Sequence, residues 1–340
     1  MPDLRHDKQL KRRHSALLEP MGVIREVMFW RKTSNTDLPQ FAGMPVNSIC
    51  VGHADRMLAV HIHGDLRQSQ MPIVCLPGYV RNMLDFSELP TGLGRGTAPV
   101  PPLVMIDLAG RGRSAPLPAK VPYSTLSDAQ DALAVLDALG IARAVICGQG
   151  HGGQVAMVMA RDRPRLFGGT ILIDAGPAVD PRGLVRLRNN LRHITGLKDS
   201  RLVSADLRKI LLTDYPDANE TKLEKLIERL FRLDSRGRAH GLYDDRLVSQ
   251  LEHLSFDDVL EPQWALFDCL SHAPMLLMRS QFGDTLRGST FDEMARRRQD
   301  ARTLVIEGRG SPALLETAQE LDAIASFAAD CEPPTSEADD

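Results

Sequence analysis

The sequence has 340 residues, of which 43% are hydrophobic and 25% are charged. This composition is typical of a folded globular protein and excludes a chain that is disordered throughout. The formal net charge of −3 gives no overall field that would attract nucleic acid or an anionic membrane, so we expect small molecules or proteins as partners.

The five cysteines are scattered, odd in number and not spaced as metal ligands, so we expect buried thiols in a reducing compartment, with no metal and no cofactor. A basic cluster at 8–13 is followed by an apolar stretch that Glu19, Arg25 and Glu26 interrupt, which argues against a signal peptide. The sequence also has no run of about 18 apolar residues. We therefore expect a cytoplasmic protein without membrane contact.

Residues 1–43 are mixed in charge and only weakly periodic, which predicts an N-terminal arm that packs late or not at all. From about Val46, short apolar runs alternate with helical ones, the pattern of a mostly parallel sheet covered on both faces. An antiparallel edge pair is expected within Ser48–Ile62. Further strands are expected at Ile73–Leu76, Leu103–Ile106, Ala144–Cys147, Thr170–Ile173, Met275–Met278 and Thr303–Ile306.

Helices are expected at Ser127–Leu139, which Gly140 would end, and at His151–Arg161. Between Pro177 and about Leu270 no strand is evident, and apolar residues repeat at helical spacing. These repeats are Leu184, Leu187, Leu191 and Ile194, then Leu223, Ile227, Leu230 and Phe231. We interpret 177–271 as an inserted helical cap that partly lines a pocket. The core would then comprise 44–176 and 272–330, followed by an acidic, disordered tail at 331–340.

The stretch Val145–Gly153 is an apolar strand that leads into a glycine-dense turn and a helix. In a strand–turn–helix elbow the tip residue has a positive φ, and the residues two positions away on each side must be small. Gly148 and Gly152 meet this requirement. Gly150 is therefore the predicted tip of the elbow.

Four motifs, each at the end of a predicted strand, together resemble the α/β-hydrolase superfamily, and specifically its esterase and C–C-hydrolase-like members. They are Leu76–Tyr79, Asp107–Ser114, the elbow, and Asp174–Pro177. The resemblance extends from Val46 to Ala329. It implies an α/β fold with a doubly wound, mostly parallel sheet and an inserted helical cap.

The resemblance also implies a catalytic triad, and two of its three positions carry unsuitable residues. The nucleophile position is Gly150 instead of serine, and the base position, after the last strand, is Ser311 instead of histidine. The acid position is retained as Asp284. Losing the nucleophile or the base of such a triad lowers turnover by about a millionfold in a serine protease, so we expect a pseudo-hydrolase that has kept its ligand pocket.

By the same resemblance, the backbone N–H groups of His151 and of Tyr79, beside Gly78, would form an oxyanion hole. A carbonyl or carboxylate ligand could still bind there; the alternative is that these amides bond only water. A protein partner could instead bind through the cap. The oligomeric state cannot be read from the sequence.

Two other functions remain open. His151 with Asp284 could act as a general base in a rewired hydrolase. Gly148, Gly150 and Gly153 also spell G-x-G-x-x-G after a strand, and Asp174 follows about 20 residues on, which is a dinucleotide-binding pattern.

The remaining polar and sulfur-containing candidates are interpreted as structural. We expect His61 and His63, which alternate on a strand, to face solvent or an edge. Cys75 and Cys147 are expected to be buried and inert. The Asp107–Ser114 motif, with Arg111 in it, is expected to fix the conformation of its loop.

Overall fold

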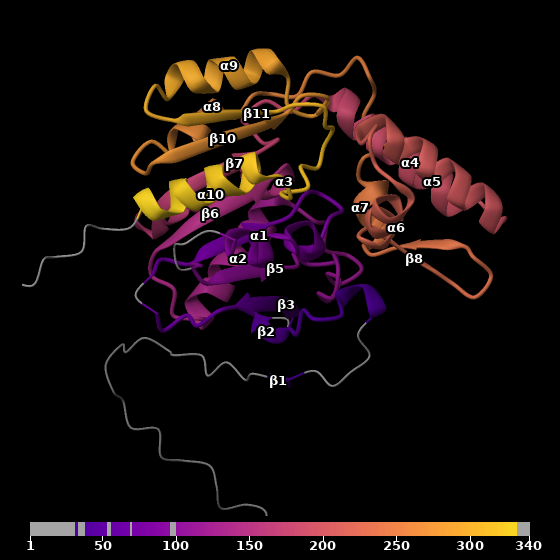
Figure 1. Cartoon of the computed structure of the whole chain (residues 1–340), viewed down its shortest axis with the longest axis horizontal. Coiled ribbons are helices and arrows are strands. Elements are labelled where there is room, and N and C mark those ends of the chain that lie inside the picture. Colours follow the sequence, from indigo (N-terminus) through magenta and orange to yellow (C-terminus); the bar gives the residue numbers. More distant parts are fainter. Residues whose placement is uncertain (1–30, 33–37, 53–55, 69, 96–99, 332–340) are drawn as a thin grey trace, which may run out of the picture.

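The computed structural model describes residues 31–32, 38–52, 56–68, 70–95 and 100–331. Within these residues, nine strands form one sheet in the order β1-β2-β3-β5-β4-β6-β7-β10-β11 (Figure 1). The pairs β1–β2, β2–β3 and β3–β5 are antiparallel, and the other pairs are parallel. The strands are β1 (Arg31–Lys32), β2 (Asn47–Val51), β3 (Arg56–His63), β4 (Ile73–Leu76), β5 (Leu103–Ile106), β6 (Ala144–Gln149), β7 (Phe167–Ile173), β10 (Met275–Ser280) and β11 (Arg302–Ile306). The predicted sheet, with its antiparallel edge pair, is confirmed.

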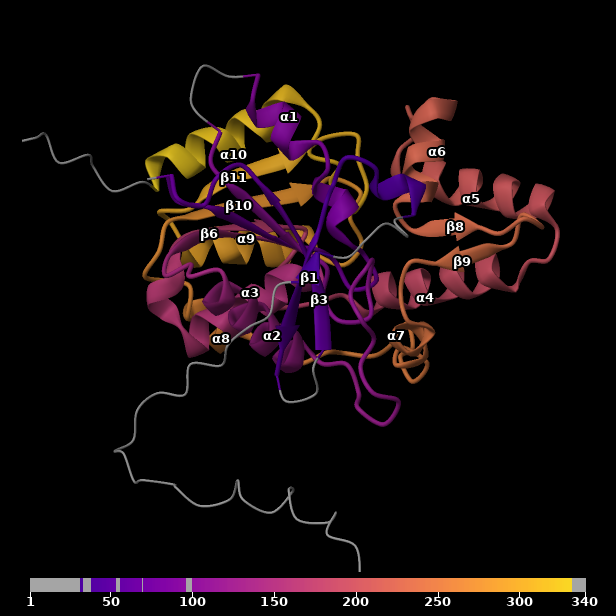
Figure 2. The same cartoon turned by 90° about the horizontal axis from the view of Figure 1, so that it is seen from below.

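Helices cover both faces of the sheet, as expected for strands that are apolar on both sides (Figure 2). One face carries α2 (Thr125–Ala138), α3 (His151–Asp162), α8 (Trp264–Asp268) and α9 (Gly288–Arg297). The opposite face carries α1 (Leu89–Leu93) and α10 (Ala318–Asp330). Along β4, Val74 and Leu76 belong to the first core, whereas Ile73 and Cys75 belong to the second. Strand alternation thus divides one sheet between two apolar layers.

The segment between β7 and β10, which we call the inserted segment (177–271), projects to one side of the sheet (Figures 1 and 2). It contains α4 (Pro181–Gly196), α5 (Ser200–Asp214), α6 (Glu220–Glu228), β8 (Phe231–Leu233), β9 (Ala239–Gly241) and α7 (Asp245–Ser249), before α8. Its helical stripe includes the buried residues Leu191 and Ile194.

The expectation that the inserted segment has no strand is wrong, because β8 and β9 pair as an antiparallel hairpin. Phe231 opens β8 and does not continue a helix. Strands of three residues are too short to display a period of two, which is why the pattern was not visible. The turn is closed by Asp234, whose carboxylate accepts the N–H of Arg238 at 3.0 Å, and by Gly237 at φ +73°.

The loop after β5 is fixed by its own polar side chains, as the sequence indicated. The carboxylate of Asp107 accepts the N–H groups of Met83 at 2.7 Å and Arg113 at 2.8 Å. The hydroxyl of Ser114 accepts the N–H of Ala59 at 2.8 Å and donates to the carbonyl of Asp107. These bonds tie the loop to β3 and to the turn after β4.

The predicted N-terminal arm and C-terminal tail lie largely outside the described residues. Where the arm is described, it packs: Phe41, in a short 3-10 helix (Pro39–Phe41), is 1% exposed beneath the guanidinium of Arg113. Cys331, which we had assigned to a disordered tail, is buried at the end of α10. Both ends of the core therefore extend further than the sequence suggested.

Two other expectations about burial need correction. His61 is only 5% exposed and its Nδ1 lies 2.7 Å from the carbonyl oxygen of Pro45, because β3 is flanked by strands on both sides. Burial lowers the pKa of His61; His63 is exposed, as expected. Cys75 and Cys147 are fully buried, but Cys50 and Cys269 are only partly buried.

Among the described residues, no helix has the length and apolar character needed to cross a membrane. The same residues contain no cluster of three or more histidine, cysteine or acidic side chains that could hold a metal ion.

Candidate active site

The turn between β6 and α3 has the geometry of a nucleophile elbow. Gly150 lies between the two elements at φ 51° and ψ −116°. A Cβ on Gly152 would lie 2.0 Å from the carbonyl oxygen of Leu76, and one on Gly148 would lie 2.5 Å from backbone atoms of Gly153. At Gly150 the only neighbour of an added Cβ would be the Cα of Gly78, at 3.8 Å. The elbow therefore has room for a side chain at its tip, but the residue there has none.

A cavity of about 420 Å³ opens above this tip, between the core and the inserted segment. Its polar floor includes Tyr79, Gly150, Asp174 and Ser311. Its wall on the side of the inserted segment is apolar and includes Leu187, Leu191, Ile194, Ile210, Ile227 and Phe231. The volume and the mostly apolar lining are typical of small-molecule pockets.

The two predicted oxyanion-hole amides face no competing protein acceptor. Within the described part of the chain, neither the N–H of Tyr79 nor that of His151 donates a hydrogen bond to another protein group. His151 is the first residue of α3, so its N–H also lies at the positive end of the helix dipole. Both lie on the cavity lining, where they can bind a ligand oxygen.

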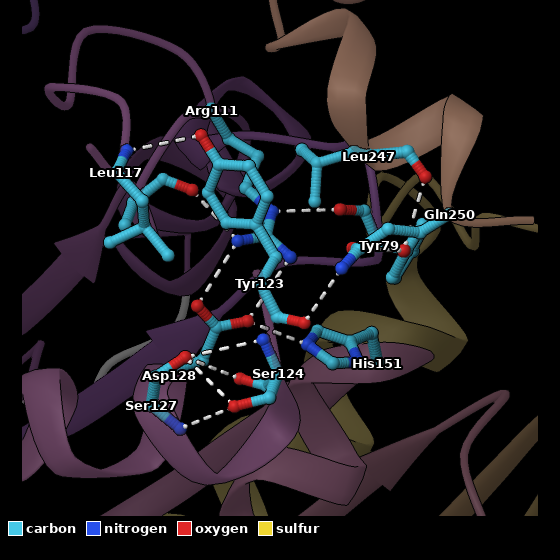
Figure 3. Close-up of polar contacts among 11 residues, drawn as sticks. Tyr79, Arg111, Leu117, Tyr123, Ser124, Ser127, Asp128, His151, Leu247 and Gln250 are labelled. Carbon is cyan, nitrogen blue, oxygen red and sulfur yellow. Dashed lines mark hydrogen bonds and ion pairs between the residues drawn. The ribbon is translucent and has the colours of Figure 1, made fainter. Parts of the chain in front are cut away.

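The imidazole of His151 is held by a buried acid on α2 (Figure 3). Its Nε2 lies 2.8 Å from a carboxylate oxygen of Asp128, and Arg111 contacts both oxygens of that carboxylate at 3.1 Å. Burial raises the pKa of Asp128, but the combined effect of Arg111 and His151 is larger and opposite. The pKa of Asp128 is therefore below its usual value. The carboxylate partner of His151 is thus Asp128, and not Asp284 as the rewired-hydrolase alternative would require.

Tyr79 links the floor of the cavity to the inserted segment (Figure 3). Its ring makes an edge contact with the ring of His151, with centroids 5.4 Å apart. The Nε of Arg111 donates to the carbonyl of Tyr79 at 2.8 Å, and the hydroxyl of Tyr79 donates to the carbonyl of Leu247, on α7, at 3.1 Å. Both ends of Tyr79 are therefore fixed.

Asp284, at the predicted acid position, forms an ion pair with Arg186 of α4. Arg186 also contacts Asp214, on α5, at 3.1 Å. All three residues line the cavity, and Asp284 is 31% exposed. Asp284 therefore ties the core to the inserted segment.

The acid beside Ser311 is Asp174, which follows β7. Asp174 accepts the N–H of Ser280 at 2.6 Å and its hydroxyl at 2.7 Å. Burial raises the pKa of Asp174, although the bonds from Ser280 and the nearby hydroxyl of Ser311 oppose that shift. At the predicted base position, the structure thus places a hydroxyl beside a buried carboxyl, without an imidazole.

These features agree with the comparisons to known proteins. A family model described as the alpha/beta hydrolase fold matches residues 71–259, more than half of the chain. The chain belongs to the alpha/beta hydrolase fold family.

Solved hydrolase structures resemble it over nearly their whole length. An alpha/beta hydrolase from Novosphingobium aromaticivorans is 26% identical with a TM-score of 0.68, over 89% of this chain and 97% of the other. A putative hydrolase from Rickettsia typhi is 22% identical with a TM-score of 0.70, over 84% and 99%, which shows the fold alone. A curated relative, the putative carbamate hydrolase RutD of Caulobacter segnis, is 32% identical over 99 residues, which is 28% of this chain and just over a third (37%) of the relative.

The hydrolase fold also accounts for the glycine pattern that resembles a dinucleotide site. Gly148 and Gly153 pack against each other inside the elbow. Asp174, which would have to bind a ribose hydroxyl, is 3% exposed and both of its oxygens are bonded to Ser280. The dinucleotide alternative therefore lacks an available acidic partner.

Sequence reasoning missed Asp128 as the partner of His151, Arg111 as the partner of Asp128, and Asp174 as the acid beside Ser311. A weak signal existed for Asp128: it stands beside Ala129 and one turn before Ala132, on a helix face whose other members are apolar except for Asp131. An acid on such a face is commonly buried and paired. No local pattern could identify its partners, which come from other elements.

Proposed function

We propose that this chain is a catalytically impaired hydrolase-fold protein that binds a small carbonyl or carboxylate compound, with the inserted segment acting as the cap over the pocket. The observation that carries the proposal is the elbow at Gly150, which keeps its backbone geometry and adjacent amides but has no nucleophilic side chain. The groups around it do not replace the triad. Ser311 supplies only a hydroxyl, beside Asp174, and the imidazole of His151 bonds to Asp128.

The lining of the cavity supports a partly apolar ligand. Leucine and isoleucine side chains of α4, α5 and α6 form one wall, whereas the backbone amides lie at the opposite side, on the floor. A compound with an alkyl chain and one carbonyl oxygen would bury the chain against this wall and place the oxygen on the amides. Burial of apolar area would supply most of the affinity, and the amides would fix the orientation.

Ester hydrolysis tests the impairment. We would assay a series of p-nitrophenyl esters with the native chain, with Gly150→Ser, and with the double variant Gly150→Ser/Ser311→His. We expect no turnover above background for the native chain and measurable turnover for the double variant only, because the nucleophile and the base act as a unit. Robust turnover by the native chain would refute the proposal.

Ligand binding tests the retained pocket. Calorimetric titration with methyl decanoate should give saturable binding to the native chain. Leu187→Trp, which fills the cavity from α4, should abolish it, whereas Leu202→Trp, at an exposed site on α5, should leave it unchanged. Equal binding by the two variants would show that the ester binds elsewhere.

A second candidate, a rewired hydrolase, is favoured by the 2.8 Å bond between His151 and Asp128. A histidine oriented by a buried carboxylate is the arrangement of a general base that activates water. If the native chain hydrolyses any ester, His151→Ala should abolish that activity. His193→Ala removes a surface histidine that is also paired with an aspartate, Asp206, and is the matched control.

We also propose a cytoplasmic location. Binding of a protein partner through the cap is the alternative to binding of a small ligand. Cell fractionation with an antibody to the chain tests the location, and the partner alternative gains support if no small ester or acid binds in the titration.

A further inference from the structure

A second cavity, of about 590 Å³, lies on the other side of α6 from the cavity above the elbow, and only Leu226 lines both. We call it the basic cavity. It is bounded by α6 of the inserted segment and by the core around α1 and the start of α10. Its charged lining residues are Arg95, Lys222, Lys225 and Arg229, with Glu88 and Glu316.

Positive charge exceeds negative charge in this lining, since four cations face two carboxylates. Lys222 pairs with Glu316, but Arg95 and Lys225 form no ion pair with any described residue. Arg229 reaches Glu88 only at 3.8 Å, beyond hydrogen-bonding distance. Among the described residues, two positive charges of this lining therefore have no compensating carboxylate.

Among the four cations of the basic cavity, Arg229 gives the clearest evidence of a ligand, because its side chain is buried. It is 8% exposed, and its Nη1 is buried without a hydrogen-bond partner among the described residues. Its Nη2 has only a long contact, 3.5 Å, to the hydroxyl of Ser87. Leaving a buried guanidinium unsatisfied is costly, and such orphaned donors often mark the place of an absent anion.

Two helix N-termini also line the basic cavity. Asn219 is the N-cap of the nine-residue α6, and Thr317 is the N-cap of the thirteen-residue α10. Side chains already cap both ends, since Asn219 accepts the N–H of Lys222 and Glu320 accepts the N–H of Thr317. The positive potential of the cavity therefore comes from its guanidinium and ammonium groups, which are common partners of phosphate oxygens.

We propose that the basic cavity is a binding site for a phosphate group, separate from the pocket above Gly150. The bound phosphate satisfies Arg229 and the free cations Arg95 and Lys225. The phosphate belongs either to the free ion or to a phosphate monoester. The proposal does not depend on the function proposed for the first cavity, because Leu226 is the one lining residue that the two cavities share.

Calorimetric titration of the full chain tests the proposal, with inorganic phosphate in one arm and glycerol 3-phosphate in the other, at constant ionic strength set with sodium chloride. We expect saturable one-to-one binding. Tighter binding of the ester would assign the site to phosphorylated organic compounds, and tighter binding of the ion would assign it to free phosphate.

Lys225→Ala is the first variant, because this side chain is exposed and its loss should not affect folding. We expect about three- to fivefold weaker binding. Lys209→Ala, at an exposed site on α5 outside the cavity, should bind as the native chain does. Arg229→Gln should abolish binding, with circular dichroism to show that the variant is folded.

Either of two results would overturn the proposal. One is the absence of saturable binding to the native chain in both arms. The other is equal affinity of the native chain and Lys225→Ala, which would place the anion elsewhere.

Discussion

Replacing Gly150 by alanine should destabilise the protein only mildly. Its φ of 51° with ψ −116° lies outside the left-handed helical region and imposes about 1–3 kcal/mol of strain on a residue with a Cβ. The added Cβ meets only the Cα of Gly78 at 3.8 Å, an ordinary contact, so no steric cost is added. Alanine also restricts the unfolded chain, which offsets about 0.4–1 kcal/mol of the strain. The net loss should be about 1 kcal/mol, which displaces the Tm by about 2 °C in a chain of this size.

Two other glycines provide matched comparisons. Gly140 has φ +68° and nothing within 4 Å of an added Cβ, so Gly140→Ala should cost about the same as Gly150→Ala. A Cβ at Gly152 would lie 2.0 Å from the backbone oxygen of Leu76. Because that oxygen belongs to the central sheet, Gly152→Ala should cost more than about 4 kcal/mol or prevent folding.

Equilibrium unfolding in urea, followed by circular dichroism, measures all three variants under the same conditions. If Gly150→Ala is as damaging as Gly152→Ala, the tip of the elbow has no room for a side chain. A serine would then not fit at position 150, and the double variant Gly150→Ser/Ser311→His could not restore hydrolysis.

Two further predictions concern buried acids outside the elbow. Arg111→Met should lower the free energy of unfolding, measured in urea, by about 3–5 kcal/mol, because it leaves the charge of Asp128 buried with His151 as its remaining partner. Adding Asp128→Asn should recover part of this loss. No recovery would contradict the pairing of Arg111 with Asp128. Burial raises the pKa of Asp107 to about 6, above that of a free aspartate at about 3.9, so the folded state binds this proton more tightly than the unfolded state. The contribution of Asp107 to stability is therefore fully present below about pH 4 and declines by up to about 3 kcal/mol as the pH rises to about 6. The free energy of unfolding of the native chain, relative to that of Asp107→Asn, should fall over this range. A constant difference between the two would refute the shift.

The sheet was predictable because its central strands are apolar on both faces and stand between clear turn residues. Ile73–Leu76 and Leu103–Ile106 have the predicted bounds, and the other central strands differ by a few residues at their ends. The β8–β9 hairpin was not predictable, since six strand residues carry too little pattern. The burial of His61 depends on which strands flank β3, and this is a property of topology.

The candidate site was predictable only where its geometry is local. The elbow follows from three glycines within five residues, Gly148, Gly150 and Gly152, and the positive φ of Gly150 agrees with it. Partners contributed by distant elements were not predictable: Asp128 comes from α2, and Asp174 from the end of β7. The motif that resembles an acid position placed Asp284 correctly beside the cavity but could not reveal that Arg186 binds it.

The hydroxyl of Tyr79 provides a mechanical connection between two parts of the molecule. Its backbone N–H faces the ligand cavity, while its side chain is bonded to the carbonyl of Leu247 in the inserted segment. A displacement of α7 must therefore either break that bond or pull the amide away from the bound oxygen. The position of α7, beneath which a ligand would enter, is thus coupled through the phenol ring of Tyr79 to the amide that would hold the ligand's carbonyl oxygen.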